Sequence, residues 1–151
     1  NDDNNNCLLF RKIQNEFTKL DKKYSFMTEN EISYKIRGAI FNVYNNLGPG
    51  LLETVYVLAL CYELKLYGLD VKTEVPVPVY YGDVELEAGF RLDILVANKV
   101  IIEVKSVEII IKTHHKQILT YLKLTGIKLG ILVNFNTDDI SKGIIRKVNE
   151  L

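Results

Sequence analysis

The sequence lacks several features that would place it in a specialised class of protein. Its 151 residues include two cysteines, Cys7 and Cys61, too few for a disulfide framework. The longest apolar runs fall far short of the roughly 20 residues that cross a bilayer, so no membrane protein is expected. Residues 1–6 are polar and acidic with no apolar stretch after them, unlike a secretory signal. These absences predict a reduced, cytoplasmic setting.

The chain also lacks net charge, so its overall charge does not indicate a nucleic-acid-binding protein. Its charges are unevenly distributed, because residues 99–151 carry 9 basic and 5 acidic side chains. This basic last third could face phosphate groups, although a solvated lysine surface explains it equally well. With 48% hydrophobic residues and no internal repeat, the chain has the composition of a single domain with a real core.

The functional domain is expected to begin near Met27, the only methionine. Thr28 and Glu31, directly after it, have the spacing of a capping box, which marks the start of a helix. Residues 1–26 differ in composition and open with an Asn/Asp cluster. We therefore interpret residues 1–26 as an N-terminal extension outside the core and residues 27–151 as the domain.

Hydrophobic spacing and turn residues predict an α/β domain with a mixed sheet. The predicted helices cover residues 31–46, 52–67 and 113–124. The predicted strands cover residues 71–81, 85–96, 100–107, 129–135 and 144–148. In the second helix, Val55, Ala59 and Leu64 are expected to face inward. Pro76 and Pro78 favour an edge position for the first strand. A strand meander followed by a crossover helix gives a mixed sheet with helices packed on it.

Three charged residues, Asp93, Glu103 and Lys105, lie inside otherwise apolar predicted strands. Burying a charge is costly unless it is paired or bound to a metal ion, so these residues indicate a site. Side chains alternate along a strand, which puts Glu103 and Lys105 on one face. If the intervening turn is residues 97–99, Asp93 lies opposite Glu103. A two-residue turn would instead point Asp93 to the other face.

Two carboxylates held close together suit a hard divalent cation such as Mg²⁺ or Mn²⁺. Such a cation polarises a phosphate oxygen and lowers the pKa of a bound water. A nearby lysine can orient that water or stabilise the charge that develops on the phosphate. The alternative is an ordinary cross-strand ion pair between Asp93 and Lys105, since patterns this short are common.

A longer set of motifs resembles a known family. Residues 50–56 contain a Gly-x-x-Glu-x-x-Tyr pattern, formed by Gly50, Glu53 and Tyr56. The resemblance continues, in order, through residues 62–64, 75–81, 90–93, 103–106, 117–122 and 130–135. On these residues the chain is similar to the GxxExxY proteins, small members of the PD-(D/E)XK nuclease superfamily, over residues 32–148.

This resemblance implies a restriction-endonuclease-like αβββαβ core and Mg²⁺-dependent hydrolysis of phosphodiester bonds in nucleic acid. Carried over by position, Asp93 and Glu103 would be metal ligands and Lys105 the catalytic lysine. Glu53 matches a helix-borne glutamate that often completes such a metal site; alternatively, it is a favourable charge at a helix N-terminus. The residue before Asp93 is Leu92, where proline is common in the superfamily.

Two further motifs lie in or near the predicted helix over residues 113–124. Gln117 and Tyr121 match the Gln-x-x-x-Tyr motif of RecB-type nucleases and share a helix face. They could position a nucleotide or Lys105, or they could be a helix edge packed on the sheet. His114 and His115 could contact phosphate or metal, but a polar helix start is the better interpretation, since adjacent helical residues cannot both face one site.

Two main function classes follow from the sequence. The first is a Mg²⁺- or Mn²⁺-dependent nuclease, favoured by the intact set of Asp93, Glu103 and Lys105. The second is a non-catalytic nuclease-fold module that binds nucleic acid or a protein partner, favoured by the neutral charge and small size. A purely structural subunit would need an exposed apolar face, which the sequence does not identify. A homodimer is compatible with each of these interpretations.

Overall fold

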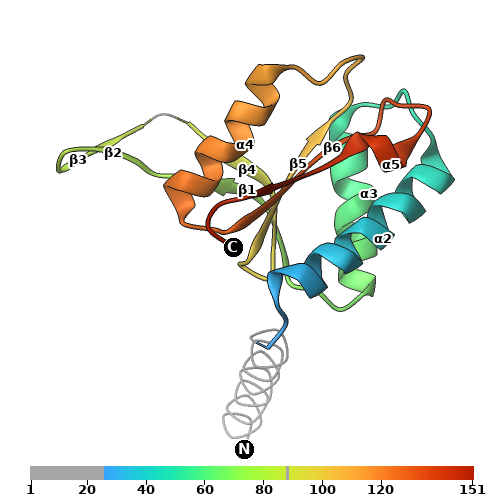
Figure 1. Ribbon diagram of the computed structural model, residues 1–151, viewed down its shortest axis with the longest axis horizontal. Helices are drawn as coiled ribbons and strands as arrows, with labels where there is room; N and C mark the ends of the chain where they lie inside the picture. The colour runs from blue at the N-terminus through green and yellow to red at the C-terminus, as the bar shows by residue number, and fades with distance from the viewer. Residues whose placement is uncertain (1–25, 88) are drawn as a thin grey trace, which may run out of the picture.

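The computed structural model describes residues 26–87 and 89–151, which form a mixed five-stranded sheet with helices on both faces (Figure 1). The helices are α2 (Glu29–Leu47), α3 (Glu53–Leu66), α4 (Lys112–Thr125) and α5 (Ile140–Gly143). The strands are β1 (Val71–Pro76), β2 (Val79–Tyr81), β3 (Val84–Leu86), β4 (Arg91–Val96), β5 (Val100–Lys105), β6 (Leu129–Asn134) and β7 (Ile144–Val148). The predicted α/β class is confirmed. Apart from Phe26, the predicted N-terminal extension lies outside the described residues.

The central sheet has the strand order β1-β4-β5-β6-β7. Strands β5 and β6 run parallel, with Val100 aligned to Leu129, and the other neighbouring pairs are antiparallel. A parallel pair needs a crossover connection, which α4 provides. Strand β1 lies at the edge of the sheet, as the prolines predicted.

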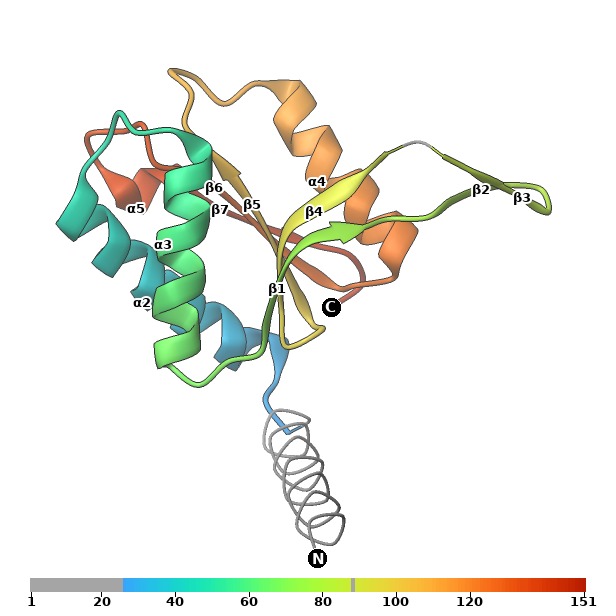
Figure 2. The ribbon, with the colours of Figure 1, turned by 180° about the vertical axis from the view of Figure 1, so that it is seen from behind.

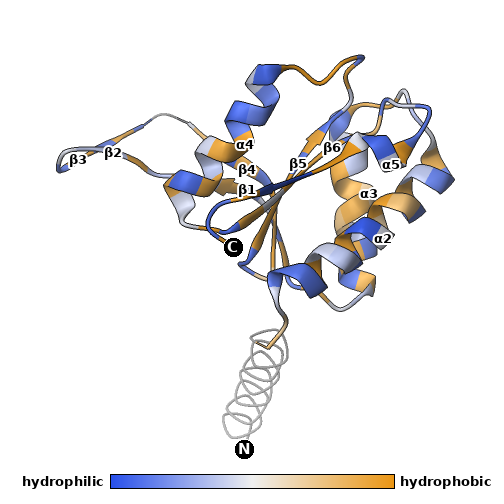
Figure 3. Cartoon of the chain, viewed as in Figure 1, coloured by the Kyte–Doolittle hydropathy of each residue, from blue (hydrophilic) through white to orange (hydrophobic). Residues whose placement is uncertain are grey.

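Helices α2 and α3 cover one face of the sheet, and α4 covers the other (Figure 2). Val104 packs in the larger core under α2 and α3, whereas Ile101 packs in the smaller core under α4. The central strands are hydrophobic along most of their length, as a sheet covered on both faces requires (Figure 3). Among the described helices, none has the length and hydrophobicity needed to cross a bilayer.

The buried face of α3 differs in part from the predicted one. Leu64 is buried as expected, but Val55 is 38% exposed, and Tyr56 and Leu60 take the inward positions. Helix α3 carries apolar residues around most of its circumference, so hydrophobic spacing does not decide which side packs inward. The ring of Tyr56 stacks on that of Phe135 with 4.3 Å between centroids, and this contact sets the orientation of the helix.

A projecting hairpin divides two of the predicted strands. The strand predicted over residues 71–81 is interrupted after Pro76, and the strand predicted over residues 85–96 is interrupted after Leu86. The intervening strands β2 and β3 pair only with each other and extend away from the body (Figures 1 and 2). Pro78 has no N–H to donate, which favours the end of the central ladder at this point.

We expect residues 27–151 to fold without the N-terminal extension. Lys99 Nζ donates a hydrogen bond to the Met27 carbonyl at 2.7 Å, tying the start of the domain to its sheet. The predicted capping box is present: the Glu31 N–H donates to Thr28 Oγ1, and the Thr28 N–H donates to Glu31 Oε2. A fragment that begins at Met27 keeps all of these contacts.

Thermal unfolding of the 27–151 fragment, followed by circular dichroism, should stay cooperative with a Tm within about 5 °C of the full chain. A 33–151 fragment is the control, because it also loses the cap and the fully buried Ile32. It should be clearly less stable. Non-cooperative melting of the 27–151 fragment would instead assign the extension to the core.

Candidate metal and catalytic site

The turn between β4 and β5 has the odd length that the site requires. Val96 pairs with Val100, which makes residues 97–99 the turn, and pairing continues to Ile94 and Ile102. The predicted three-residue turn is therefore confirmed. Asp93 and Glu103 are next in this register, at the point where regular pairing of the two strands stops.

Asp93 and Glu103 each bind the backbone of the opposite strand. The Asp93 N–H donates to Glu103 Oε1 at 3.2 Å, and the Val104 N–H donates to Asp93 Oδ2 at 2.9 Å. The two carboxyl groups thus take the place of backbone carbonyl acceptors where the ladder ends. They are also close enough to share a hydrogen bond with each other. These hydrogen bonds place both carboxyl groups between the two strands.

Burial raises the pKa of both carboxyl groups. Glu103 is only 2% exposed, and its burial, together with the negative charge of Asp93, raises its pKa to about 8. Burial also raises the pKa of Asp93, against the opposing effect of the hydrogen bond from the Val104 N–H. At neutral pH the pair therefore retains a proton, which a cation would have to displace.

Lys105 lies half-buried at the end of β5, beside the two carboxyl groups. Its positive charge lowers the pKa of both Asp93 and Glu103, although burial outweighs this effect. The ion pair between two described residues is that of Lys142 with Asp139, and Lys105 forms none with a described carboxylate. Lys105 therefore does not form the direct ion pair with Asp93 that the alternative interpretation required. Its ammonium group can donate hydrogen bonds to other groups.

Glu53 reaches from the first turn of α3 to the end of β5. Its Oε1 accepts a hydrogen bond from the Ser106 N–H at 3.2 Å, and its charge raises the pKa of Asp93. A cavity of about 290 Å³ lies between α3 and β1, with Glu53, Glu74 and Asp93 in its lining. In the described part of the chain, no three His, Cys, Asp or Glu side chains are already arranged to hold a metal ion. Glu53 therefore shares a cavity with Asp93 without completing a three-carboxylate cluster.

Gln117 and Tyr121 contact each other on α4. Gln117 Nε2 donates to the Tyr121 hydroxyl at 3.2 Å, and the ring of Tyr121 is part of the core under α4. Burial raises the pKa of Tyr121, and the charges of Glu103 and Asp93 raise it further. The tyrosine thus packs on the sheet, as the helix-edge alternative expected, while its hydroxyl lies within electrostatic reach of the carboxyl pair.

The two histidines belong to the start of α4. His114 Nδ1 accepts a hydrogen bond from the Ile111 N–H at 3.2 Å, so this side chain caps the helix, in agreement with a polar helix start. His115 Nδ1 is buried and has no hydrogen-bond partner among the described residues. Neither histidine joins a metal-binding group in the described part of the chain.

Ser106 and Asn134 were given no role in the sequence analysis. Ser106 binds both Glu53 and the loop before α3, since its hydroxyl donates to the Leu51 carbonyl at 2.6 Å. Asn134 Nδ2 donates to the Val107 carbonyl at 2.8 Å, which ties the segment after β5 to the end of β6. The sequence does contain a signal for both residues, because each is a polar residue at the end of a buried strand. Side chains at such positions commonly form hydrogen bonds with the last backbone groups of the strand.

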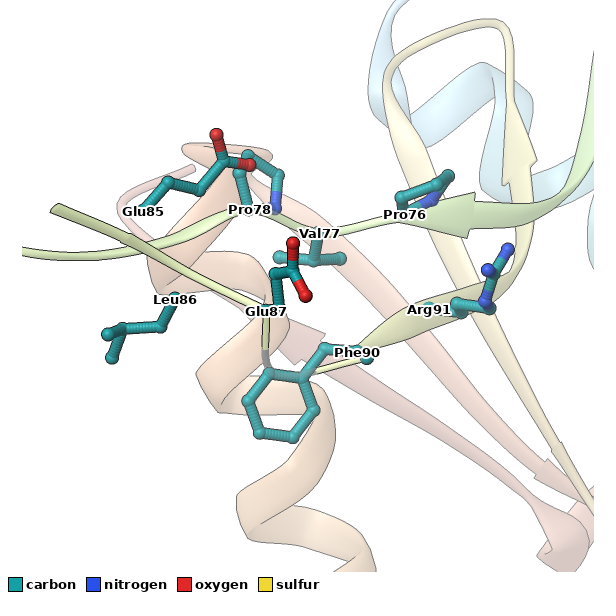
Figure 4. A pocket seen from close by; sticks show the side chains of 9 residues that line it. Pro76, Val77, Pro78, Glu85, Leu86, Glu87, Phe90 and Arg91 are labelled. Carbon is teal, nitrogen blue, oxygen red and sulfur yellow. The ribbon is translucent and has the colours of Figure 1, made fainter.

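A separate hollow of about 300 Å³ lies at the base of the hairpin (Figure 4). Glu85 and Glu87 extend to one side of the chain there and Leu86 to the other, with Phe90 and Arg91 nearby. Two carboxylates in its lining oppose the binding of phosphate. The lining of this hollow contains neither Asp93 nor Glu53, so it is separate from the cavity beside Asp93.

The donor set of Asp93 and Glu103 fits a hard divalent cation. Two carboxyl groups converge in a buried position, and both have raised pKa values because burial disfavours their charged forms. A divalent cation supplies the missing positive charge, and Mg²⁺ commonly keeps several waters beside one or two carboxylates. The absence of a preformed three-carboxylate group is thus compatible with this ion.

Comparison with protein families gives one match. The family model described as "PD-(D/E)XK nuclease superfamily" matches residues 30–147, more than three-quarters of the chain. Comparisons with curated proteins and with solved structures found no significant match. The mixed sheet with helices on both faces is that expected of the restriction-endonuclease-like fold. The chain belongs to the PD-(D/E)XK nuclease superfamily.

Proposed function

We propose that this protein is a divalent-metal-dependent nuclease that hydrolyses phosphodiester bonds of nucleic acid. The observation that carries the proposal is the convergence of Asp93 and Glu103 at the end of the β4–β5 ladder, beside a lysine that forms no ion pair with a described carboxylate. Membership in the nuclease superfamily supports the same chemistry. We also infer a finer place among the GxxExxY proteins, supported by the pattern of Gly50, Glu53 and Tyr56.

Asp93 and Glu103 would hold Mg²⁺ or Mn²⁺ through their carboxylate oxygens. When bound, the cation supplies polarisation of a phosphate oxygen and a lowered pKa for a coordinated water. The backbone hydrogen bonds of both carboxyl groups orient them before any cation arrives, which reduces the entropy lost on binding. Glu103 has to release its proton as the cation enters.

Lys105 is the proposed catalytic lysine. Its ammonium group follows Glu103 by two positions on β5 and acts on both carboxyl groups through its charge. From there it can donate a hydrogen bond to an attacking water or to a phosphate oxygen that gains charge. Because Lys105 forms no direct ion pair with a described carboxylate, this donation does not require a bond to be broken first.

Glu53, Gln117 and Tyr121 take supporting roles in this proposal. Glu53 is the third carboxylate of the metal site, acting directly or through a bound water from its place in the shared cavity. Gln117 and Tyr121 form a hydrogen-bonded pair that positions a nucleotide or Lys105. The charge effect of Glu103 and Asp93 on Tyr121 supports this placement.

The charge around the cavity makes nucleic-acid binding dependent on the cation. Glu53, Glu74 and Asp93 line the cavity and repel phosphate when no cation is present. A bound divalent cation reverses this local effect. The basic last third of the chain then supplies longer-range attraction to the phosphate backbone, in line with its 9 basic residues.

We place the protein in the cytoplasm, which is supported by Cys61 as a free, buried thiol.

A homodimer is also part of the proposal, since many substrates of such sites present two strands to be cut. Gel filtration with light scattering would measure the mass in solution directly. A monomer at all concentrations would remove the dimer without affecting the chemistry.

A cleavage assay tests the proposed activity. The full chain would be incubated with single- and double-stranded DNA and with RNA, each with Mg²⁺, Mn²⁺ or EDTA. We expect metal-dependent cleavage, and a loss of at least about 100-fold in rate for Lys105→Ala, the range expected when a transition-state donor is removed. Lys65→Ala, on the exposed surface of α3 and outside the basic last third, is the matched control and should cleave normally.

Two results would contradict the nuclease proposal. Cleavage by Lys105→Ala at the wild-type rate would exclude this lysine from the chemistry. Metal-dependent binding of nucleic acid without cleavage of any substrate would favour the alternative, a non-catalytic module of the nuclease fold. The melting curve of each variant, measured alongside, distinguishes loss of chemistry from loss of the fold.

A further inference from the structure

Ser106 joins the end of β5 to the loop that precedes α3. It directly follows Lys105, and it makes two hydrogen bonds to that loop region. Its hydroxyl donates to the Leu51 carbonyl at 2.6 Å, and its N–H donates to Glu53 Oε1 at 3.2 Å. One residue therefore connects the strand that carries Glu103 and Lys105 to the helix start that carries Glu53.

The loop is held from its other side by Tyr56. The Tyr56 hydroxyl donates to the Gly48 carbonyl at 2.6 Å and accepts a hydrogen bond from the Leu51 N–H at 3.1 Å. The ring of Tyr56 is fully buried and stacked on Phe135. Both backbone groups of Leu51 are thus bound, the N–H by a residue of the core and the carbonyl by Ser106.

This arrangement gives Glu53 a defined position relative to β5. Glu53 is exposed to solvent, and an exposed glutamate ordinarily samples several rotamers. Here the Ser106 N–H binds one carboxylate oxygen, while the Ser106 hydroxyl fixes the loop from which α3 starts. Without the hydroxyl, the hydrogen bond from the Ser106 N–H to Glu53 would remain, but the bond from Ser106 to the Leu51 carbonyl would be lost.

We propose that Ser106 is a positioning residue that holds Glu53 toward the Asp93–Glu103 pair and thereby increases the affinity of the site for a divalent cation. This inference rests on the proposed function, in which Glu53 contributes to the metal site. Residues that orient metal ligands typically change metal affinity by about 10–100-fold when they are replaced. Because Ser106 acts through Glu53, its effect should disappear when the Glu53 carboxylate is removed.

Calorimetric titration of the full chain with Mn²⁺ tests the inference. We expect Ser106→Ala to bind Mn²⁺ about tenfold more weakly than the wild type. Ser106→Thr keeps the hydroxyl and should bind within about threefold of wild type. In a Glu53→Gln background, adding Ser106→Ala should change the affinity by less than about twofold, because residues that act through one another are not additive.

Ser141→Ala is the matched control. The Ser141 hydroxyl also makes a hydrogen bond at a helix start, to Asp139, but it belongs to α5 and does not contact the site. Its Mn²⁺ affinity should equal that of the wild type. A melting curve of each variant accompanies its titration. If Ser106→Ala does not fold, Ser106→Cys takes its place, because a thiol is only a weak hydrogen-bond donor.

The outcomes separate this inference from the function on which it rests. Wild-type Mn²⁺ binding together with an unchanged affinity of Ser106→Ala would overturn the inference alone. If Ser106→Ala weakened Mn²⁺ binding tenfold both with and without the Glu53 carboxylate, Ser106 would have a general structural role. That result would also overturn the inference. No Mn²⁺ binding by the wild type would overturn both the metal site and the inference.

Discussion

Asp93→Asn and Glu103→Gln are each expected to abolish divalent-cation binding while leaving the protein folded. A neutral amide oxygen is a much weaker ligand than a carboxylate for a hard cation. We expect a loss of more than about 100-fold in affinity, since even residues that only orient a ligand contribute about 10–100-fold. The amide oxygens can still accept the hydrogen bonds from the Val104 and Asp93 N–H groups, so the strand ends stay connected.

The same substitutions should leave the stability of the metal-free protein unchanged or slightly raised. Asp93 and Glu103 repel each other when both are charged, and either amide removes that repulsion. A simple ion pair between Asp93 and Lys105 predicts the opposite, because Asp93→Asn would leave an uncompensated positive charge. The sign of the stability change therefore distinguishes a metal site from an ion pair.

Mn²⁺ calorimetry and thermal melts in EDTA measure these two effects. Glu85→Gln is the control, because it removes one negative charge from the hairpin that extends away from the body. It should keep the wild-type affinity. Undiminished Mn²⁺ binding in both Asp93→Asn and Glu103→Gln would end the nuclease proposal for this site.

The stability of the metal-free protein should fall as the pH rises from about 4.5 to about 8. The pKa of Glu103 is about 8 in the folded protein and 4.5 as its ordinary value, so the folded state binds more protons in this interval. Stability falls with pH wherever the folded state holds the extra proton. The stabilisation from the protonated Glu103 is fully present below pH 4.5 and is lost as the pH rises through the pKa of Glu103 in the folded protein. For a shift from 4.5 to about 8 this stabilisation amounts to roughly 5 kcal/mol.

Urea unfolding in EDTA at intervals from pH 5 to pH 9 measures this loss. Glu103→Gln resembles the protonated side chain, so it should match the wild type near pH 5 and exceed it near pH 9. Saturating Mn²⁺ should restore wild-type stability at high pH, because the cation takes the place of the proton. Parallel stability curves for wild type and Glu103→Gln would show that Glu103 does not hold the proton.

The position of the carboxyl pair was predictable because it depends on local rules. Strand alternation places Glu103 and Lys105 on one face, and an odd-length turn sets Asp93 opposite Glu103. The observed pairing of Val96 with Val100 has that length. The position of β1 at the edge of the sheet likewise followed from its prolines. These features involve neighbouring segments of the chain, with Asp93 and Glu103 ten positions apart, so local spacing bears on them directly.

The hairpin and the inward face of α3 were not predictable in this way. Two long β-rich segments read as continuous strands, and only the tertiary structure interrupts them after Pro76 and Leu86. Helix α3 has apolar residues on opposite sides, so either side satisfies the hydrophobic pattern. The stacking of Tyr56 on Phe135, which directly follows β6 and lies almost 80 positions later in the chain, decides between them.

The sequence by itself determined the α/β class and the strands that carry Asp93 and Glu103, because hydrophobic periodicity is a local property. It allowed two registers of β4 with β5, and the observed pairing of Val96 with Val100 selects the one that places Asp93 opposite Glu103. Only the tertiary structure decided how Glu53 relates to that pair. Glu53 meets the end of β5 through Ser106, which lies 53 positions away along the chain. Contacts between such distant segments depend on how helices pack on the sheet, and no spacing rule within either segment encodes that packing.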